Sequence, residues 1–183
     1  MAKVGLKGIR YAVLDTEDGT YGTPASLGKG VTASVTPNNQ DASLYADDAL
    51  AESDSSFIDA DVSVTVDDGR DATVLAPLLG HTVSTGEVVR NSGDVAPYVG
   101  MGRIVTKVVN NVKAFKAEFL CKVKFAEPSQ EENTKGDSVE FGTTTIEGKA
   151  STIASGLWSK TKEFATEAEA ETYLDTCFGV EEA

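Results

Sequence analysis

The chain contains 183 residues, of which 40% are hydrophobic and 25% are charged, a composition typical of a single globular domain with its own core. Its 16 Lys and Arg are outnumbered by 29 Asp and Glu, which gives a formal net charge of −13. This charge excludes a protein that binds nucleic-acid phosphates by attraction, because such proteins carry a surplus of cations.

The two cysteines and the first residues indicate where the chain folds. Cys121 and Cys177 are too few for a disulfide framework and have apolar or aromatic neighbours, so we expect reduced thiols in or near the core. Met1–Gly5 leads directly into a strand-like segment, and no apolar run reaches the length of a bilayer. We therefore expect a protein that is made and folded in the cytoplasm and has no membrane partner.

Alternating strand patterns dominate the first third of the chain. Ile9–Leu14 has the β-branched and aromatic content of a strand, and Asp18-Gly19 predicts a hairpin turn after it. Val31–Thr36 alternates apolar with hydroxylated residues. Phe57–Val66 alternates most clearly, with Ile58, Ala60, Val62, Val64 and Val66 on one face and Asp59, Asp61, Ser63 and Thr65 on the other. The two aspartates are therefore predicted to face away from the core.

Between the last two strands lies an acidic stretch, Pro37–Phe57, without Lys or Arg. Its helical spacing lasts only two turns, so we expect a long inter-strand loop. Leu44, Tyr45 and Leu50 are too apolar for a disordered segment, which predicts contacts outside the loop's own β core. The candidate contact residues are Leu44, Tyr45, Asp47, Asp48, Leu50, Glu52 and Asp54, with Asp41 in the same acidic set.

A short internal helix follows the second of these strands. Asp71–Leu79 has the pattern of such a helix, with its first residue as the N-cap. The carboxylates of Asp67, Asp68 and Asp71 do not follow the order of an EF-hand loop, so they favour a turn over a calcium site. His81 is the only histidine, and the sequence shows no partners for a catalytic triad or a metal, which favours a structural role.

The middle of the chain holds most of its basic residues. Val83–Arg90 predicts a hairpin or a bulged strand, and Pro97–Thr106 and Val112–Phe125 predict two antiparallel strands. Lysines alternate with apolar residues here, a pattern typical of a solvated sheet face or of a basic face that meets the acidic stretch of another copy. The candidate residues of that basic face are Arg103, Lys113, Lys116 and Lys122.

The last third contains further strand chemistry and the clearest helix. Ser138–Ile146 and Glu147–Ile153 have strand chemistry, and Trp158 is expected to be a core or interface anchor. Ser159 and Lys162 match a Ser-x-x-Lys nucleophile pattern, but no helix or companion motif accompanies them, so we interpret the match as chance. Thr166–Phe178 predicts an amphipathic helix that begins after a Thr166 cap.

These elements predict one domain over residues 1–183, mostly β, built as a β-sandwich or barrel with a short internal helix and a C-terminal helix at about 166–178. No constellation of catalytic residues is apparent. We therefore predict a protein that is not an enzyme and uses no cofactor or metal.

Several segments in combination resemble a known family. In chain order they are VTASVTPNNQDASLYADDALAESDSSF, VTVDD, GDVAPYVGMG, AEFLCKVKFAEPSQEENTKGDSVEFGTTTIEG and FATEAEAETYLD. The set is similar to the major tail proteins of siphophages and related prophages, the phi13-type tail tube proteins. The resemblance covers nearly the whole chain, with Asp15–Gly28 and His81–Asn91 as the parts that resemble nothing in particular.

The resemblance implies a tail-tube fold that forms hexameric rings, with the sheets of neighbouring subunits joined into an inner barrel. Stacked rings would form the non-contractile tube of a virion, assembled in the host cytoplasm, through which double-stranded DNA passes without specific binding. The implied partners are other copies of the chain, a tape-measure protein, and the tail terminator and distal tail proteins.

Residue-level expectations fit this hypothesis. An acidic lining keeps phosphates from adhering, and Asp59 and Asp61 are the candidate lumen-facing carboxylates. A tube protein of a contractile or phage-derived injection particle is the nearest alternative. An acidic calcium-binding β module and a hydrolase that uses Ser159 or His81 are alternatives from other classes of protein.

Overall fold

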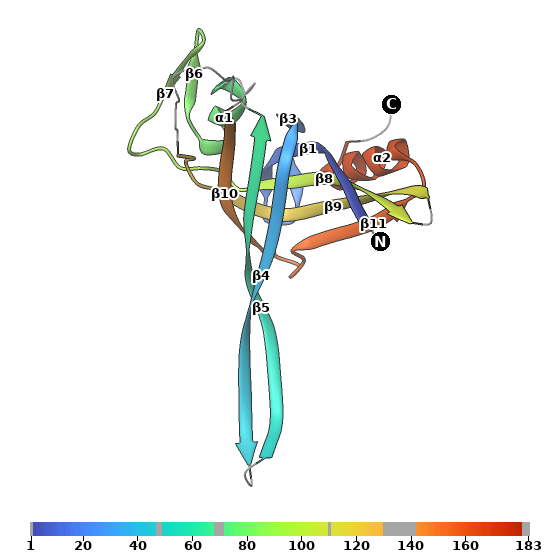
Figure 1. Ribbon diagram of the computed structural model, residues 1–183. Coiled ribbons are helices and arrows are strands. Elements are labelled where there is room, and N and C mark those ends of the chain that lie inside the picture. The colour runs from blue at the N-terminus through green and yellow to red at the C-terminus, as the bar shows by residue number, and fades with distance from the viewer. Residues whose placement is uncertain (1, 47–48, 68–71, 110, 130–141, 181–183) are drawn as a thin grey trace, which may run out of the picture.

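The computed structural model describes residues 2–46, 49–67, 72–109, 111–129 and 142–180 (Figure 1). The strands are β1 (Ala2–Thr16), β2 (Thr20–Tyr21), β3 (Ala25–Gly28), β4 (Gly30–Ala46), β5 (Ala49–Asp67), β6 (Thr82–Ser84), β7 (Glu87–Val89), β8 (Val99–Val109), β9 (Val112–Phe125), β10 (Thr143–Ser151) and β11 (Ser159–Phe164). The helices are α1 (Ala72–Leu79) and α2 (Glu167–Phe178). The predicted fold class is confirmed: the protein is mostly β, with a short internal helix and a C-terminal helix.

One antiparallel sheet holds most of the strands. Its order is β2-β1-β8-β9-β10-β5-β4, with β3 also paired to β1 and β11 also paired to β9, while β6 and β7 form a separate hairpin. This order ends at β2 on one side and at β4 on the other, so the hydrogen bonds between the described strands do not close the sheet into a barrel.

The folded sheet encloses the main hydrophobic core. Val62, Val64 and Val66 of β5 are buried against Met101 of β8 and Phe125 of β9, so the β5 half of the sheet lies over the β8–β9 half. Residues of α1 pack against the same cluster. Burial of each such side chain contributes about 1.5–3 kcal/mol to stability, which makes this cluster the principal source of the fold's stability.

Helix α2 covers the opposite face of the β8–β9 half (Figure 1). Its buried residues Ala170, Leu174 and Phe178 contact a second cluster that includes Phe119 and Ile104. The predicted Thr166 cap is present as part of a capping box, since the Thr166 hydroxyl accepts from the Glu169 amide and the Glu169 carboxylate accepts from the Thr166 amide. Gly179 ends the helix in the left-handed conformation, at a φ of 76°.

The acidic stretch is a β-hairpin, so the predicted inter-strand loop at about 37–57 is wrong. Strands β4 and β5 pair in antiparallel register from Gly30 opposite Val66 to Ala46 opposite Ala49. The two halves of the stretch are each other's partners, which satisfies the backbone groups on the edge that they share. Figure 1 shows the hairpin extending well beyond the rest of the molecule.

One predicted core position in β5 is also wrong. Ile58 was expected to share the buried face with Ala60, but its side chain is 55% exposed. The register shifts here, because Asn38 pairs with Asp59 and Asn39 pairs with Phe57, so Ile58 is the extra residue of a bulge. The Phe57 ring is the inward residue instead and stacks on Trp158, with ring centroids 4.6 Å apart.

Candidate interface: the projecting hairpin and the hollow at its base

The hairpin of β4 and β5 has a base and a projecting part. At the base, Ala33 and Val35 pack against the main core. Beyond Asn38, the strands pair with each other only, from Asn39 opposite Phe57 to the end of the hairpin. On β4 the projecting part comprises the eight residues Asn39–Ala46, and β5 supplies the paired strand. At about 3.3 Å per residue its length is roughly 25 Å.

The candidate contact residues of the acidic stretch lie in this projecting part. Leu44, Tyr45, Leu50, Glu52 and Asp54 belong to its paired strands. Asp47 and Asp48, between the strands, lie outside the described residues. The stretch therefore continues the two predicted strands and does not form a loop between them.

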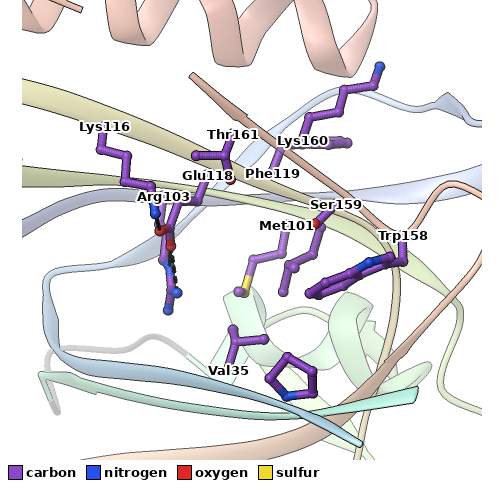
Figure 2. Close-up of a pocket in the computed structure, with 12 residues that line it drawn as sticks. Val35, Met101, Arg103, Lys116, Glu118, Phe119, Trp158, Ser159, Lys160 and Thr161 are labelled. Atoms are coloured by element: carbon purple, nitrogen blue, oxygen red, sulfur yellow. Dashed lines mark hydrogen bonds and ion pairs between the residues drawn. The ribbon is translucent and has the colours of Figure 1, made fainter. Parts of the chain in front are cut away.

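A hollow of about 380 Å³ lies at the base of the hairpin (Figure 2). It opens between β4 and the face of the sheet that does not carry α2. Its lining residues are Val35 and Pro37 of β4, Met101 and Arg103 of β8, Lys116, Glu118, Phe119 and Leu120 of β9, and Trp158, Ser159, Lys160 and Thr161 on or next to β11.

One end of the hollow is apolar. Met101 and Leu120 lie opposite each other on β8 and β9 and are 1% and 5% exposed. Trp158 is partly buried, and its ring is held by the stack on Phe57. Figure 2 shows Trp158, Met101 and Val35 grouped together. Sequence reasoning identified Trp158 as an anchor but had no means of placing it beside the hairpin.

The other end of the hollow is charged. Arg103 donates from Nε at 2.7 Å to one oxygen of Glu118, Nη2 of Arg103 lies 2.6 Å from the same oxygen, and Lys116 pairs with the other oxygen. Burial raises the pKa of Glu118, but the hydrogen bond from Lys116 and the charge of Arg103 outweigh it, so the pKa lies below its ordinary value. Two cations therefore share one ionised carboxylate, which leaves one positive charge in excess.

Nη1 of Arg103 is buried and has no hydrogen-bond partner among the described residues. The Arg103 side chain is only 12% exposed. A buried N–H group without an acceptor is unfavourable, so the two N–H groups of Nη1 form an unsatisfied donor site beside the hollow.

The four predicted basic residues do not form one face. Arg103 and Lys116 lie together at the hollow, but Lys122 pairs with Glu17 at 2.6 Å and lies over the Tyr98 ring. Lys113 is exposed near the β8–β9 turn and has no ion-pair partner in the part of the chain that the structure describes. Alternation along one strand could not reveal which carboxylates of other strands neutralise each lysine.

Asp59 and Asp61 lie on the outer face of β5, as predicted, but with partners of their own. Nδ2 of Asn38 donates to both, at 2.8 and 2.9 Å, and Nζ of Lys149 lies 3.0 Å from Asp59 and 3.4 Å from Asp61. The hydrogen bonds from Asn38, followed by those from Lys149, lower the pKa of each carboxyl group. This cluster carries one net negative charge, so it is a weaker acidic surface than two free aspartates.

His81 is held by two carboxylates. Its Nδ1 lies 2.7 Å from Asp94 and its Nε2 lies 2.7 Å from Glu127, which also accepts from Nε of Arg90 at 3.1 Å. The hydrogen bonds to Asp94 and Glu127 raise the pKa of His81, which favours an imidazolium that donates from both nitrogens. The arrangement ties together three segments and fits the predicted structural role.

The Ser-x-x-Lys pattern falls on strand β11. Ser159 lies opposite Leu120 and Lys162 opposite Ala117 in the register with β9. Residues three apart in a strand point to opposite faces, so the pattern does not bring this hydroxyl and this amine together.

Two comparisons with known proteins give no match. No protein-family model matches the chain, and a search of the curated proteins gives no significant match. Within the described residues, no three or more His, Cys, Asp and Glu form a group able to hold a metal ion. Asp68 and Asp71 of the alternative calcium site lie outside those residues. The described helices include none with the length and apolar character needed to cross a membrane.

Proposed function

We propose that the protein is the structural subunit of a self-assembling tube, a tail tube protein whose rings stack into a conduit for DNA. One observation carries the proposal: a long acidic hairpin projects from a body that already has a complete core. The resemblance of the sequence segments supplies the kind of assembly, hexameric rings in a phage tail.

The exposed hairpin supports the proposal of assembly, because a projecting two-stranded hairpin gains stability when another chain covers it. A two-stranded hairpin in water is marginally stable at best, and an open strand edge invites pairing with other chains. Strand β4 is the end of the sheet, so its outer edge is unpaired along the described strand order. A second copy that covers the hairpin would stabilise the paired strands and cover the unpaired edge of β4.

The geometry of such a contact supports a polymer. In this proposal the hairpin binds a different part of the other copy, which makes the contact heterologous. Heterologous contacts generate rings where the rotation closes and filaments where it does not, and a tube of stacked rings uses both.

The charge of the chain suits a conduit for DNA. A net charge of −13 repels phosphates, and this repulsion weakens beyond about 8–10 Å at physiological salt. In this proposal DNA passes without adhering, and Asp59 and Asp61 remain candidates for the lumen with Lys149 beside them. The tape-measure, terminator and distal tail proteins are the further partners, and the virion is the location.

Removal of the projecting part tests the proposal. Gln40 pairs with Ser56, so replacement of Asp41–Ser55 by Asn-Gly closes the hairpin at a paired position with a favoured two-residue turn. Negative-stain microscopy should show hollow tubes for the intact protein and none for the shortened one, which should remain a folded monomer by circular dichroism and sedimentation. Intact protein that stays monomeric in all conditions, with or without tail-initiation proteins, would contradict the proposal.

A further inference from the structure

The hollow at the base of the hairpin has an apolar end and a charged end. Its apolar end is formed by Met101, Leu120 and Trp158, and at its charged end Arg103 and Lys116 share the Glu118 carboxylate. An apolar side chain next to a carboxylate would fit both ends. The excess positive charge beside Glu118 favours an acidic segment, because an acidic occupant would meet Arg103 and Lys116 together.

The projecting hairpin has this chemistry. Pro37–Phe57 combines carboxylates with Leu44, Tyr45 and Leu50 and contains no Lys or Arg. The hairpin cannot fill the hollow of its own chain, because Val35 and Pro37 at its base form one wall of that hollow and the two strands stay paired out to Ala46 and Ala49.

We infer that the hollow receives the projecting hairpin of a second copy of this chain. Apolar residues of the incoming hairpin cover Trp158, and its carboxylates pair with Lys116 at the charged end. The hollow and the projecting part lie at opposite ends of the same hairpin, so each contact leaves one free hairpin and one free hollow for the next. This inference rests on the proposed function and assigns its contact surface.

Cysteine cross-linking tests the contact directly. Thr161 lines the hollow and lies opposite Glu118, whereas Lys162, one residue later, is not part of the lining and lies opposite Ala117, which packs with α2. The Lys162 amine lies over the Tyr173 ring of α2, so this side chain is on the other face of the strand. The test protein carries Tyr45→Cys with Thr161→Cys, and the control carries Tyr45→Cys with Lys162→Cys. The intact protein, with Cys121 and Cys177, gives the background.

Assembled test protein should give a ladder of disulfide-linked oligomers on a non-reducing gel, and the control should give only background. Tubes that form without this ladder, or with equal ladders in both proteins, would overturn the inference and leave the proposed function intact. Absence of tubes from the intact protein would contradict the proposed function itself.

A matched pair of charge variants provides a second readout. Lys116→Gln and Lys162→Gln each remove one positive charge, one at the hollow and one on the face that carries α2. Lys116→Gln should raise the critical concentration for assembly roughly tenfold, as expected for one charge-assisted hydrogen bond, and Lys162→Gln should leave it within about twofold. Equal critical concentrations for the two variants, with unchanged melting temperatures, would count against the hollow as the receptor.

Discussion

The body and the projecting hairpin differ in where their stability originates. The body buries side chains on both faces of its β8–β9 half, against β5 on one side and α2 on the other. Beyond Asn38, the hairpin relies on the pairing of two strands with each other. The body can therefore fold as a unit by itself, whereas the hairpin is completed by a contact with something else.

This difference separates two kinds of sequence constraint. Residues of the body are selected for packing within one chain, and substitutions there should change the free energy of unfolding of the monomer. Residues of the projecting hairpin should instead change the association of copies. The following predictions, in order of decreasing effect on monomer stability, test that division.

Leu174→Ala should be the most damaging of these substitutions. Leu174 is fully buried in the α2 cluster, so the variant should lose about 2–5 kcal/mol of unfolding free energy in urea denaturation of the monomer. Leu44→Ala in the hairpin is the comparison, with an expected change within about 0.5 kcal/mol in the monomer but a clear loss of assembly. Equal destabilisation by the two substitutions would mean that the hairpin belongs to the folding core.

Thr166→Ala should have an intermediate effect. It removes the N-cap of α2 and half of its capping box, which should cost about 1 kcal/mol. Thr166→Ser keeps the hydroxyl and is the control, with an expected change of a few tenths of a kcal/mol. Because the helix packs on the body, thermal melting of the monomer should detect the loss, and assembly of the remaining folded protein should be unaffected.

His81→Gln should reduce stability in a pH-dependent manner. Since the folded-state pKa of His81 is raised, its ion pairs stabilise the protein fully below the unfolded-state value near 6.5 and are lost as the pH rises through the folded-state value. The charged groups that contact it are Asp94 and Glu127, and Arg90 binds Glu127. The difference in melting temperature between the intact protein and the variant should thus be larger at pH 6 than at pH 9. A difference that grows with pH would contradict the claim that His81 is protonated in the folded protein.

Ile58→Thr should have the smallest effect. The bulge exposes this side chain, so the monomer should lose no more than about 0.5 kcal/mol, whereas Val62→Ala on the same strand removes a buried side chain and should cost more. Urea denaturation of both variants measures the contrast. A loss for Ile58→Thr as large as that for Val62→Ala would place Ile58 in the core, as its alternation pattern predicted.

Much of the body could be predicted from local patterns. Thr166, Glu169 and Gly179 define α2 through chemistry within one turn at each end, and Asp18-Gly19 defines a turn between adjacent strands. The hairpin was missed because its acidic and small residues lack strand alternation, and its pairing depends on a register that no single segment encodes. The hollow could not be predicted, since Val35, Arg103 and Trp158 meet only through the folding of the sheet.

The central claim is that the projecting hairpin is completed by another copy of the chain. Hydrogen exchange measured by mass spectrometry on monomers and on assembled protein tests this claim most directly. The account predicts fast exchange at residues 39–56 in the monomer, strong protection of the same residues after assembly, and little change in β8, β9 and α2. Protection of residues 39–56 that is equal in monomer and assembly would contradict it.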